Sequence, residues 1–191
     1  MRHLFTLIFT IASVWSFAQI KDGAKVIDLS FSYSDFNSNG SSSFSFVQPL
    51  VGFSITENQV FYGGFRYERQ KQNFSNTSSK ENIVSLVLAY EKLFELNSKI
   101  YFAPIISGSF GFGKGNDPAG DSDISSFRIG ISPRLHYFIT NKWSVVASVG
   151  AISYSKEVQK SDNGDFATES FGASLNASNV NFGIRMILNN E

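Results

Sequence analysis

The sequence predicts an all-β fold: an eight-stranded antiparallel up-and-down transmembrane β-barrel. Three observations predict this class. Apolar and polar residues alternate with period two over eight segments. The polar connections between these segments alternate between long and short, as they do when one rim of a sheet carries loops and the other carries tight turns. After residue 18, no apolar run is long enough for a transmembrane helix, so a membrane could be crossed only by strands.

The composition narrows the possible function classes. The chain has 191 residues, of which 42% are hydrophobic, 15% are aromatic and only 17% are charged. This length predicts a single domain, and the low charge is unlike that of a disordered chain. Because there is no cysteine, a disulfide scaffold and a thiolate metal site are excluded. The 16 basic and 16 acidic residues balance, which argues against a nucleic-acid partner.

Residues 1–18 have the layout of a cleaved secretory signal peptide. Arg2 supplies a positive start, Leu4 to Phe17 form an apolar run, and Ser16 and Ala18 place small residues before a cut ahead of Gln19. The alternative is a membrane anchor helix, but the run is shorter than the roughly 20 residues that a span requires. We therefore expect residues 19–191 to form the mature barrel domain.

The eight segments differ in how regular their alternation is. Six alternate cleanly, and two more, at about 43–55 and 143–157, do so less regularly. A change of parity between Leu175 and Val180 predicts a bulge near residues 177–179. Proline cannot donate to a strand ladder, so bulges are also expected at Pro49, Pro104 and Pro133. The six regular segments carry apolar residues at Ile27 to Tyr33, Phe61 to Tyr67, Val84 to Tyr90, Ile100 to Phe112, Phe127 to Tyr137 and Val180 to Leu188.

The connections are predicted from their Ser, Asn, Gly and Asp content. Four long ones are expected as loops at about 36–42, 72–80, 113–123 and 158–168. Three short ones are expected at Thr56–Asn58, Leu96–Ser98 and Thr140–Lys142.

Periodicity does not tell a soluble barrel from a membrane barrel, but three features favour an apolar face turned outward to lipid. The apolar face has charges only near strand ends, at Arg69, Lys71 and Lys92, where they can reach lipid head groups. The polar face mixes small residues with balanced charges, which a narrow barrel can pair inside. Aromatic residues gather near the short-turn rim, as membrane girdles do; they are Phe53, Phe61, Phe94, Tyr101, Phe102, Tyr137 and Trp143.

With these features the chain resembles the small outer-membrane β-barrels of Gram-negative bacteria, of the OmpA/OmpX type, and more broadly the porin-like outer membrane beta-barrel proteins. The resemblance rests on the signal segment, the eight strands and motifs such as Pro49 with Gly52-Phe53 and Pro133 with Tyr137. It covers residues 19–191 and implies a location in the cell outer membrane, with the short turns in the periplasm and the long loops outside. It also implies outer-membrane lipid, lipopolysaccharide and the barrel assembly machinery as partners.

No catalytic set is expected, and no cofactor or metal. His136 is the one histidine after the signal segment, and its surroundings, Arg134-Leu135-His136-Tyr137, do not resemble the motif of lipid deacylase barrels. Asp117, Asp121 and Asp123 lack the closing Glu of a calcium loop. The charged residues predicted to face the interior are the most informative group, because a buried charge needs a partner. The expected interior polar cluster, structural or gating, is Asp28, Arg66, Glu68, Glu91, Arg128, Arg134, His136 and Arg185.

The sequence thus predicts a barrel that is not an enzyme, with an ion-paired and mostly plugged lumen. Its four loops would serve surface interaction, through a surface ligand, or envelope integrity. The first alternative is a narrow pore for ions or small solutes. The second is a secreted soluble barrel that carries a ligand.

Overall fold

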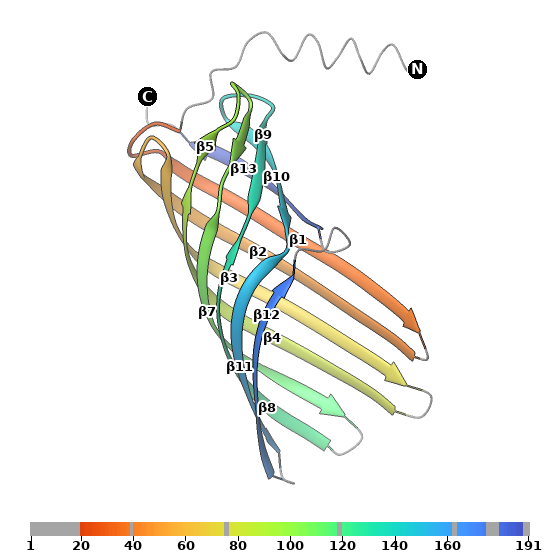
Figure 1. Ribbon diagram of the computed structural model, residues 1–191. Coiled ribbons are helices and arrows are strands. Elements are labelled where there is room, and N and C mark those ends of the chain that lie inside the picture. The colour runs from red at the N-terminus through yellow and green to blue at the C-terminus, as the bar shows by residue number, and fades with distance from the viewer. Residues whose placement is uncertain are drawn as a thin grey trace, which may run out of the picture.

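In the computed structural model, one antiparallel sheet of 13 strands curls into a barrel-like wall (Figure 1). The structure describes residues 20–38, 40–74, 77–117, 120–161, 164–174 and 180–188; the predicted signal segment lies outside them. The all-β antiparallel class is therefore confirmed. The strands are β1 Lys25–Ser38, β2 Gly40–Thr56, β3 Gln59–Phe74, β4 Thr77–Lys92, β5 Phe94–Glu95, β6 Ile100–Phe102, β7 Ile105–Asp117, β8 Gly120–Ser132, β9 Arg134–Phe138, β10 Trp143–Val149, β11 Ala151–Ser161, β12 Gly164–Ser174 and β13 Val180–Leu188.

The sheet curls far enough for its first strand to meet its last. β1 pairs with β2 from Lys25 to Ser38. On its other edge, β1 pairs with β13 from Lys25 to Phe31. Beyond Phe31, towards Ser38, the described residues of β1 form a ladder only with β2. Those of β12 form one only with β11. The wall is therefore continuous at the end with the short turns and has an unpaired seam between β1 and β12 towards the hairpin end.

The predicted count of eight strands differs from the 13 that the structure defines. Ladders are interrupted at Leu93, at Ala103-Pro104, at Pro133 and at Gly150, and residues 175–179, between β12 and β13, lie outside the described residues. Proline lacks the N–H that a ladder needs, which explains the breaks at Pro104 and Pro133. Across Leu93 and Pro104 the register is unchanged, since Glu91 pairs with Ile105 and Phe94 with Phe102.

The predicted bulges are only partly found. At Pro49 there is none, because Val47 pairs with Tyr67 and Leu50 with Gly64, so both strands advance equally. Opposite Pro133 a bulge lies on the partner strand: Ile131 pairs with Ile152, whereas the Val149 amide donates to the Pro133 carbonyl. The extra residue is Gly150, whose φ of +69° suits glycine. The bulge predicted near residues 177–179 falls outside the described residues.

The four predicted long loops are wrong: their described residues are almost all in strands. β1 continues to Ser38 and β2 starts at Gly40, and only two residues separate the strands of each of the other three hairpins. Polar residues there satisfy their backbone groups in the ladder of an established hairpin, whatever their weak strand propensity. Gly120 and Gly164, with φ of +130° and +128°, start the strands after two of these turns. This end of the sheet therefore consists of extended hairpins, which project from the wall in Figure 1.

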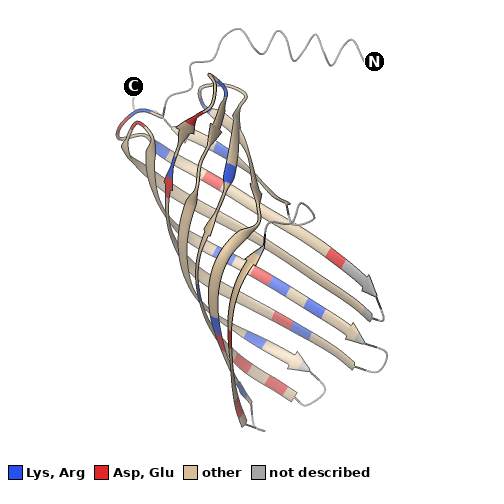
Figure 2. Ribbon diagram, viewed as in Figure 1, with Lys and Arg blue, Asp and Glu red and all other residues tan. Residues whose placement is uncertain are grey.

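The two faces of the sheet have inverted polarity. Outward positions are apolar and exposed; Leu88 is 65% exposed, Val51 64% and Phe65 59%. Inward charged side chains are buried, and Asp28, Glu91 and Arg185 are fully buried. Figure 2 shows charges gathered towards the hairpins and few along the strands between the two ends. No helix in the described part of the chain is long and apolar enough to cross a membrane.

Most of the aromatic residues predicted near the short-turn rim are exposed there, with one correction. Phe53, Phe61, Phe94 and Trp143 are exposed near the short turns, at 53%, 53%, 44% and 44%. Tyr101, in contrast, is buried and faces inward, where its ring packs edge-on against Phe138 with centroids 5.1 Å apart. The alternation along β6 places Tyr101 opposite to Phe102, so the two cannot share a face.

Candidate functional site

The interior is filled in layers, of which the first, nearest the short turns, is apolar. It contains Val26 of β1, Val60 of β3 and Ile187 of β13, each at most 1% exposed, together with the fully buried Phe138. Ile20, the first described residue, is also buried in this layer. These side chains break the polar-inward pattern at the strand ends, and they close the turn end of the lumen with apolar contacts.

Above the apolar layer lies a charged layer, which we define as Asp28, Glu91, Arg134, His136 and Arg185. Arg185 Nη2 is 2.9 Å from Asp28 Oδ2 and 2.6 Å from Glu91 Oε2. Arg134 Nη1 lies 3.4 Å from Asp28 Oδ2 and 3.6 Å from Glu91 Oε1. Two guanidinium groups therefore balance two carboxylates, which is the condition for keeping such charges out of water.

His136 and Tyr62 complete the hydrogen bonding of Glu91. His136 Nε2 lies 3.0 Å from Glu91 Oε1, and the Tyr62 hydroxyl donates to Glu91 Oε2 at 2.8 Å. Because a carboxylate only accepts, His136 must carry its proton on Nε2. The Tyr62 ring fits because Gly52, its partner on β2, has no side chain: a Cβ there would lie 2.6 Å from two ring carbons.

Three polar atoms of this layer or next to it have no hydrogen-bond partner among the described residues: Arg185 Nη1, His136 Nδ1 and Ser144 Oγ. Ser144 lies directly opposite Arg185 on β10. His136 is on the neighbouring β9, opposite Val146. Buried polar groups of this kind are commonly satisfied by an internal water.

The second charged group lies nearer the hairpins and consists of Arg66, Glu68 and Arg128. Arg128 Nη1 is 2.9 Å from Glu68 Oε1, and Arg66 Nη1 is 3.5 Å from the same oxygen. Arg66 Nε also donates to Gln48 Oε1 at 2.6 Å, and its guanidinium stacks on the Phe46 ring at 4.7 Å. Two cations share one carboxylate in this group, so it carries a net positive charge.

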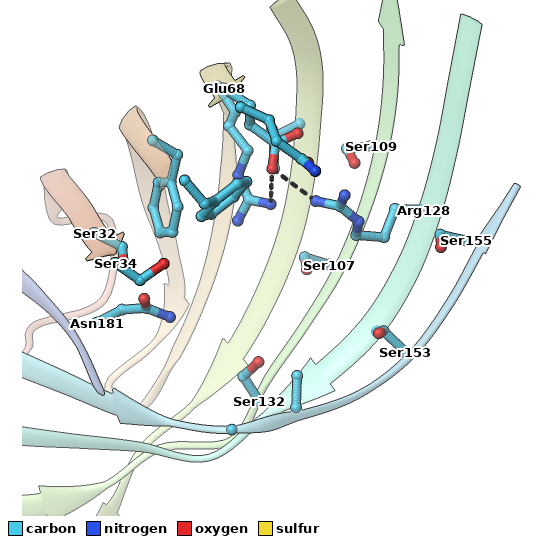
Figure 3. A pocket seen from close by; sticks show the side chains of 18 of the residues that line it. Ser32, Ser34, Glu68, Ser107, Ser109, Arg128, Ser132, Ser153, Ser155 and Asn181 are labelled. Carbon is cyan, nitrogen blue, oxygen red and sulfur yellow. Dashed lines mark hydrogen bonds and ion pairs between the residues drawn. The ribbon is translucent and has the colours of Figure 1, made fainter. Parts of the chain in front are cut away.

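A cavity of about 610 Å³ lies beside this group, and Arg66, Glu68 and Arg128 line it. Serine hydroxyls from several strands surround it, and Figure 3 shows Arg128 reaching Glu68 across its upper part. The labelled serines are Ser32, Ser34, Ser107, Ser109, Ser132, Ser153 and Ser155. The cavity is polar and lies above the charged layer, on the side of the hairpins.

The structure brings the eight sequence-predicted interior residues together as two groups rather than one cluster. Asp28, Glu91, Arg134, His136 and Arg185 form the charged layer, and Arg66, Glu68 and Arg128 line the cavity. Sequence reasoning missed Tyr62 and Gln48, which are uncharged, and the apolar layer. The apolar layer has a sequence signal: Val60, Leu93, Phe138 and Ile187 are apolar at inward parity next to short turns.

Among the described residues, no group of three or more His, Asp or Glu side chains is placed to hold a metal ion. Asp121 and Asp123 lie on the first strand positions of β8. The Asp121 carboxylate accepts from the Asn116 amide across the hairpin.

No protein family and no curated protein matches the sequence. Solved structures do match the fold. One of them is the crystal structure of a major outer membrane protein from Thermus thermophilus, with a TM-score of 0.51 and 13% sequence identity. The match covers 87% of this chain and 99% of that chain. At this identity the likeness shows a shared fold.

Proposed function

We propose that this chain is an integral outer-membrane β-barrel, closed at its turn end, whose four hairpins act at the cell surface. The inverted polarity of the wall carries the proposal. Exposed side chains such as Phe65, Val51 and Leu88 cover the outside, while charged side chains are paired inside. In water this arrangement would expose a large apolar surface, whereas in a bilayer it places apolar side chains against lipid. The fold shared with a Thermus outer membrane protein supports the same location.

The proposal includes a barrel of eight chain segments, as in small barrels of the OmpA/OmpX type. Pairing of β1 with both β2 and β13 supports closure. β4 and β5, β6 and β7, β8 and β9, and β10 and β11 each follow one another with at most two intervening residues. On this view each pair is one segment with a local break, and residues 175–179 join β12 to β13.

Closure of the lumen favours a surface role over transport. An eight-stranded barrel is just wide enough for its own side chains to fill, and here two layers of buried side chains fill the turn end. Outer-membrane lipid, lipopolysaccharide and the assembly machinery are the partners that this location implies. The hairpins, rich in Ser and Asn, are the surface that a ligand or neighbouring envelope component would meet. We propose no enzymatic activity.

The test is ion conductance of residues 19–191 refolded into a planar bilayer. The material is first shown to be folded by a heat-dependent shift in gel mobility. We expect a silent bilayer, because the apolar and charged layers block the lumen. Discrete conductance steps from the wild-type protein would overturn the closed barrel and establish the pore alternative. A folded protein that stays soluble after removal of detergent would overturn the membrane location and favour a secreted ligand carrier.

A further inference from the structure

We propose that the upper cavity is a binding site for a small polyhydroxylated solute that carries one carboxylate, of the sugar-acid class. The inference goes beyond the proposed surface role, which assigns no ligand to the interior. It rests on the size of the cavity, its hydroxyl lining and the unequal pairing of its three charged side chains.

The cavity has the size and position of a receptor for a small molecule. Its volume of about 610 Å³ is within the range of roughly 300–1,000 Å³ that is usual for ligand sites. The charged layer lies below it and the hairpins lie above it. A solute can therefore arrive from the hairpin side, and the buried side chains beneath prevent it from passing through.

The hydroxyl lining matches a ligand with many hydroxyl groups. Ser32 and Ser34 come from β1, Ser107 and Ser109 from β7, and Ser153 and Ser155 from β11. A serine hydroxyl both donates and accepts hydrogen bonds, so a ring of serines can pair with sugar hydroxyls in either sense. Phe44 lines one side of the cavity and offers aromatic surface to the C–H groups of a sugar ring.

Arg128 supplies the contact for one carboxylate. Arg66 is already held by Gln48, Glu68 and the Phe46 ring. Arg128 contacts Glu68 through Nη1, its side chain is 41% exposed, and it lines the cavity. A guanidinium fork binds a carboxylate through two parallel hydrogen bonds, so the rest of this fork is available to a ligand.

The charged side chains around the cavity favour a ligand with one negative charge over a ligand with several. Arg66, Glu68 and Arg128 leave the cavity with a single net positive charge. Glu81 and Glu157 line a small adjoining pocket together with Glu68 and Arg128. Their carboxylates would repel a doubly charged phosphate ester, whereas a sugar acid with one carboxylate avoids most of this repulsion.

The test measures binding of D-glucuronate to the refolded full mature chain in detergent micelles by isothermal titration calorimetry. D-glucose and glucose 6-phosphate serve as comparison ligands. The variants are Arg128→Gln, which leaves Glu68 its contact with Arg66, and Ser153→Leu, which fills the cavity. Ser125→Leu is the matched control, because Ser125 lies on the outer face of β8 opposite Phe112 and Val158. All variants are checked for folding by gel mobility.

We expect saturable one-to-one binding of glucuronate, and weaker binding of glucose and of glucose 6-phosphate. Arg128→Gln should weaken glucuronate binding by about tenfold or more, since a charged hydrogen bond is lost, and should leave glucose binding unchanged. Ser153→Leu should abolish binding, and Ser125→Leu should not alter it. Folded wild-type protein that shows no saturable glucuronate binding would overturn the proposal. Equal binding of glucose and glucuronate, or an equal loss in Ser125→Leu, would also overturn it. None of these results depends on whether the barrel conducts ions.

Discussion

Arg185 and Asp28 face each other across the β13–β1 ladder, and their side chains meet inside the barrel at 2.9 Å. The same Nη2 atom of Arg185 reaches Glu91 of β4 at 2.6 Å. One guanidinium therefore joins the closing pair of strands to a strand elsewhere in the wall. Closure of the sheet and filling of its lumen depend on the same side chain.

Replacing Arg185 with alanine should strongly destabilise the protein. The change leaves Asp28 and Glu91 buried with only Arg134 to balance them, and breaking a buried ion pair costs about 3–5 kcal/mol. Urea titration in lipid vesicles, followed by tryptophan fluorescence, measures the free energy of unfolding. The control is Lys156→Ala, which removes an ion pair with Glu169 whose side chains are 46% and 53% exposed. This pair is exposed to solvent, so its loss should change the free energy of unfolding little. Equal stability of the two variants would show that the charged layer does not hold the barrel closed.

Gly52 should be intolerant of a side chain. In Gly52→Val the new carbons would collide with the Tyr62 ring, which would have to leave its hydrogen bond to Glu91. Overpacking of this kind costs about 1–3 kcal/mol. Gly108→Val is the matched control, because nothing lies within 4 Å of a Cβ at Gly108. Thermal unfolding monitored by the gel shift should show a lower midpoint for Gly52→Val alone. The same midpoint for both variants would mean that Tyr62 can move without loss.

Cysteine labelling can test which face meets lipid, because the native chain has no cysteine. Leu88→Cys lies on the outer face of β4 and Ser107→Cys in the cavity wall of β7. A fluorophore at residue 88 should be quenched by brominated lipid and protected from iodide in the water. A fluorophore at residue 107 should show the reverse. Iodide quenching at both positions would contradict a lipid-facing outer surface.

The sequence predicts well which side chains face the interior, because successive side chains of a strand point to opposite faces of the sheet. Asp28 and Arg185 are both predicted to face the interior, and the register places them opposite each other. The polarity of each inward position follows from the same rule. Parity does not predict which partner each charge selects, since Glu68 has two arginines and Glu91 has two arginines and a histidine.

The hairpin strands and the cavity escaped prediction for physical reasons. The segments expected as loops are strands, because a paired hairpin can hold Ser, Asn and Gly in its ladder even though their individual propensities favour turns. The cavity also escaped, because small inward residues such as Ser107 and Ser153 leave empty volume only when strands on opposite sides of the lumen are placed together. The bulge at Gly150 was expected at Pro133, its neighbour across the ladder.

Paired cysteines can test both the closure of the wall and its seam. Ile27 and Met186 are register partners in the β1–β13 ladder, and antiparallel partners have Cα separations that a disulfide can bridge. Ile27→Cys with Met186→Cys should therefore oxidise in air and change the mobility of the unfolded protein on a non-reducing gel. Tyr33 and Phe171 are exposed on the two strands that border the seam, β1 and β12, which share no ladder among the described residues. Tyr33→Cys with Phe171→Cys should stay reduced under the same conditions. A disulfide in this second pair would mean that β1 and β12 close on each other, so that solutes could reach the cavity only through the ring of hairpins.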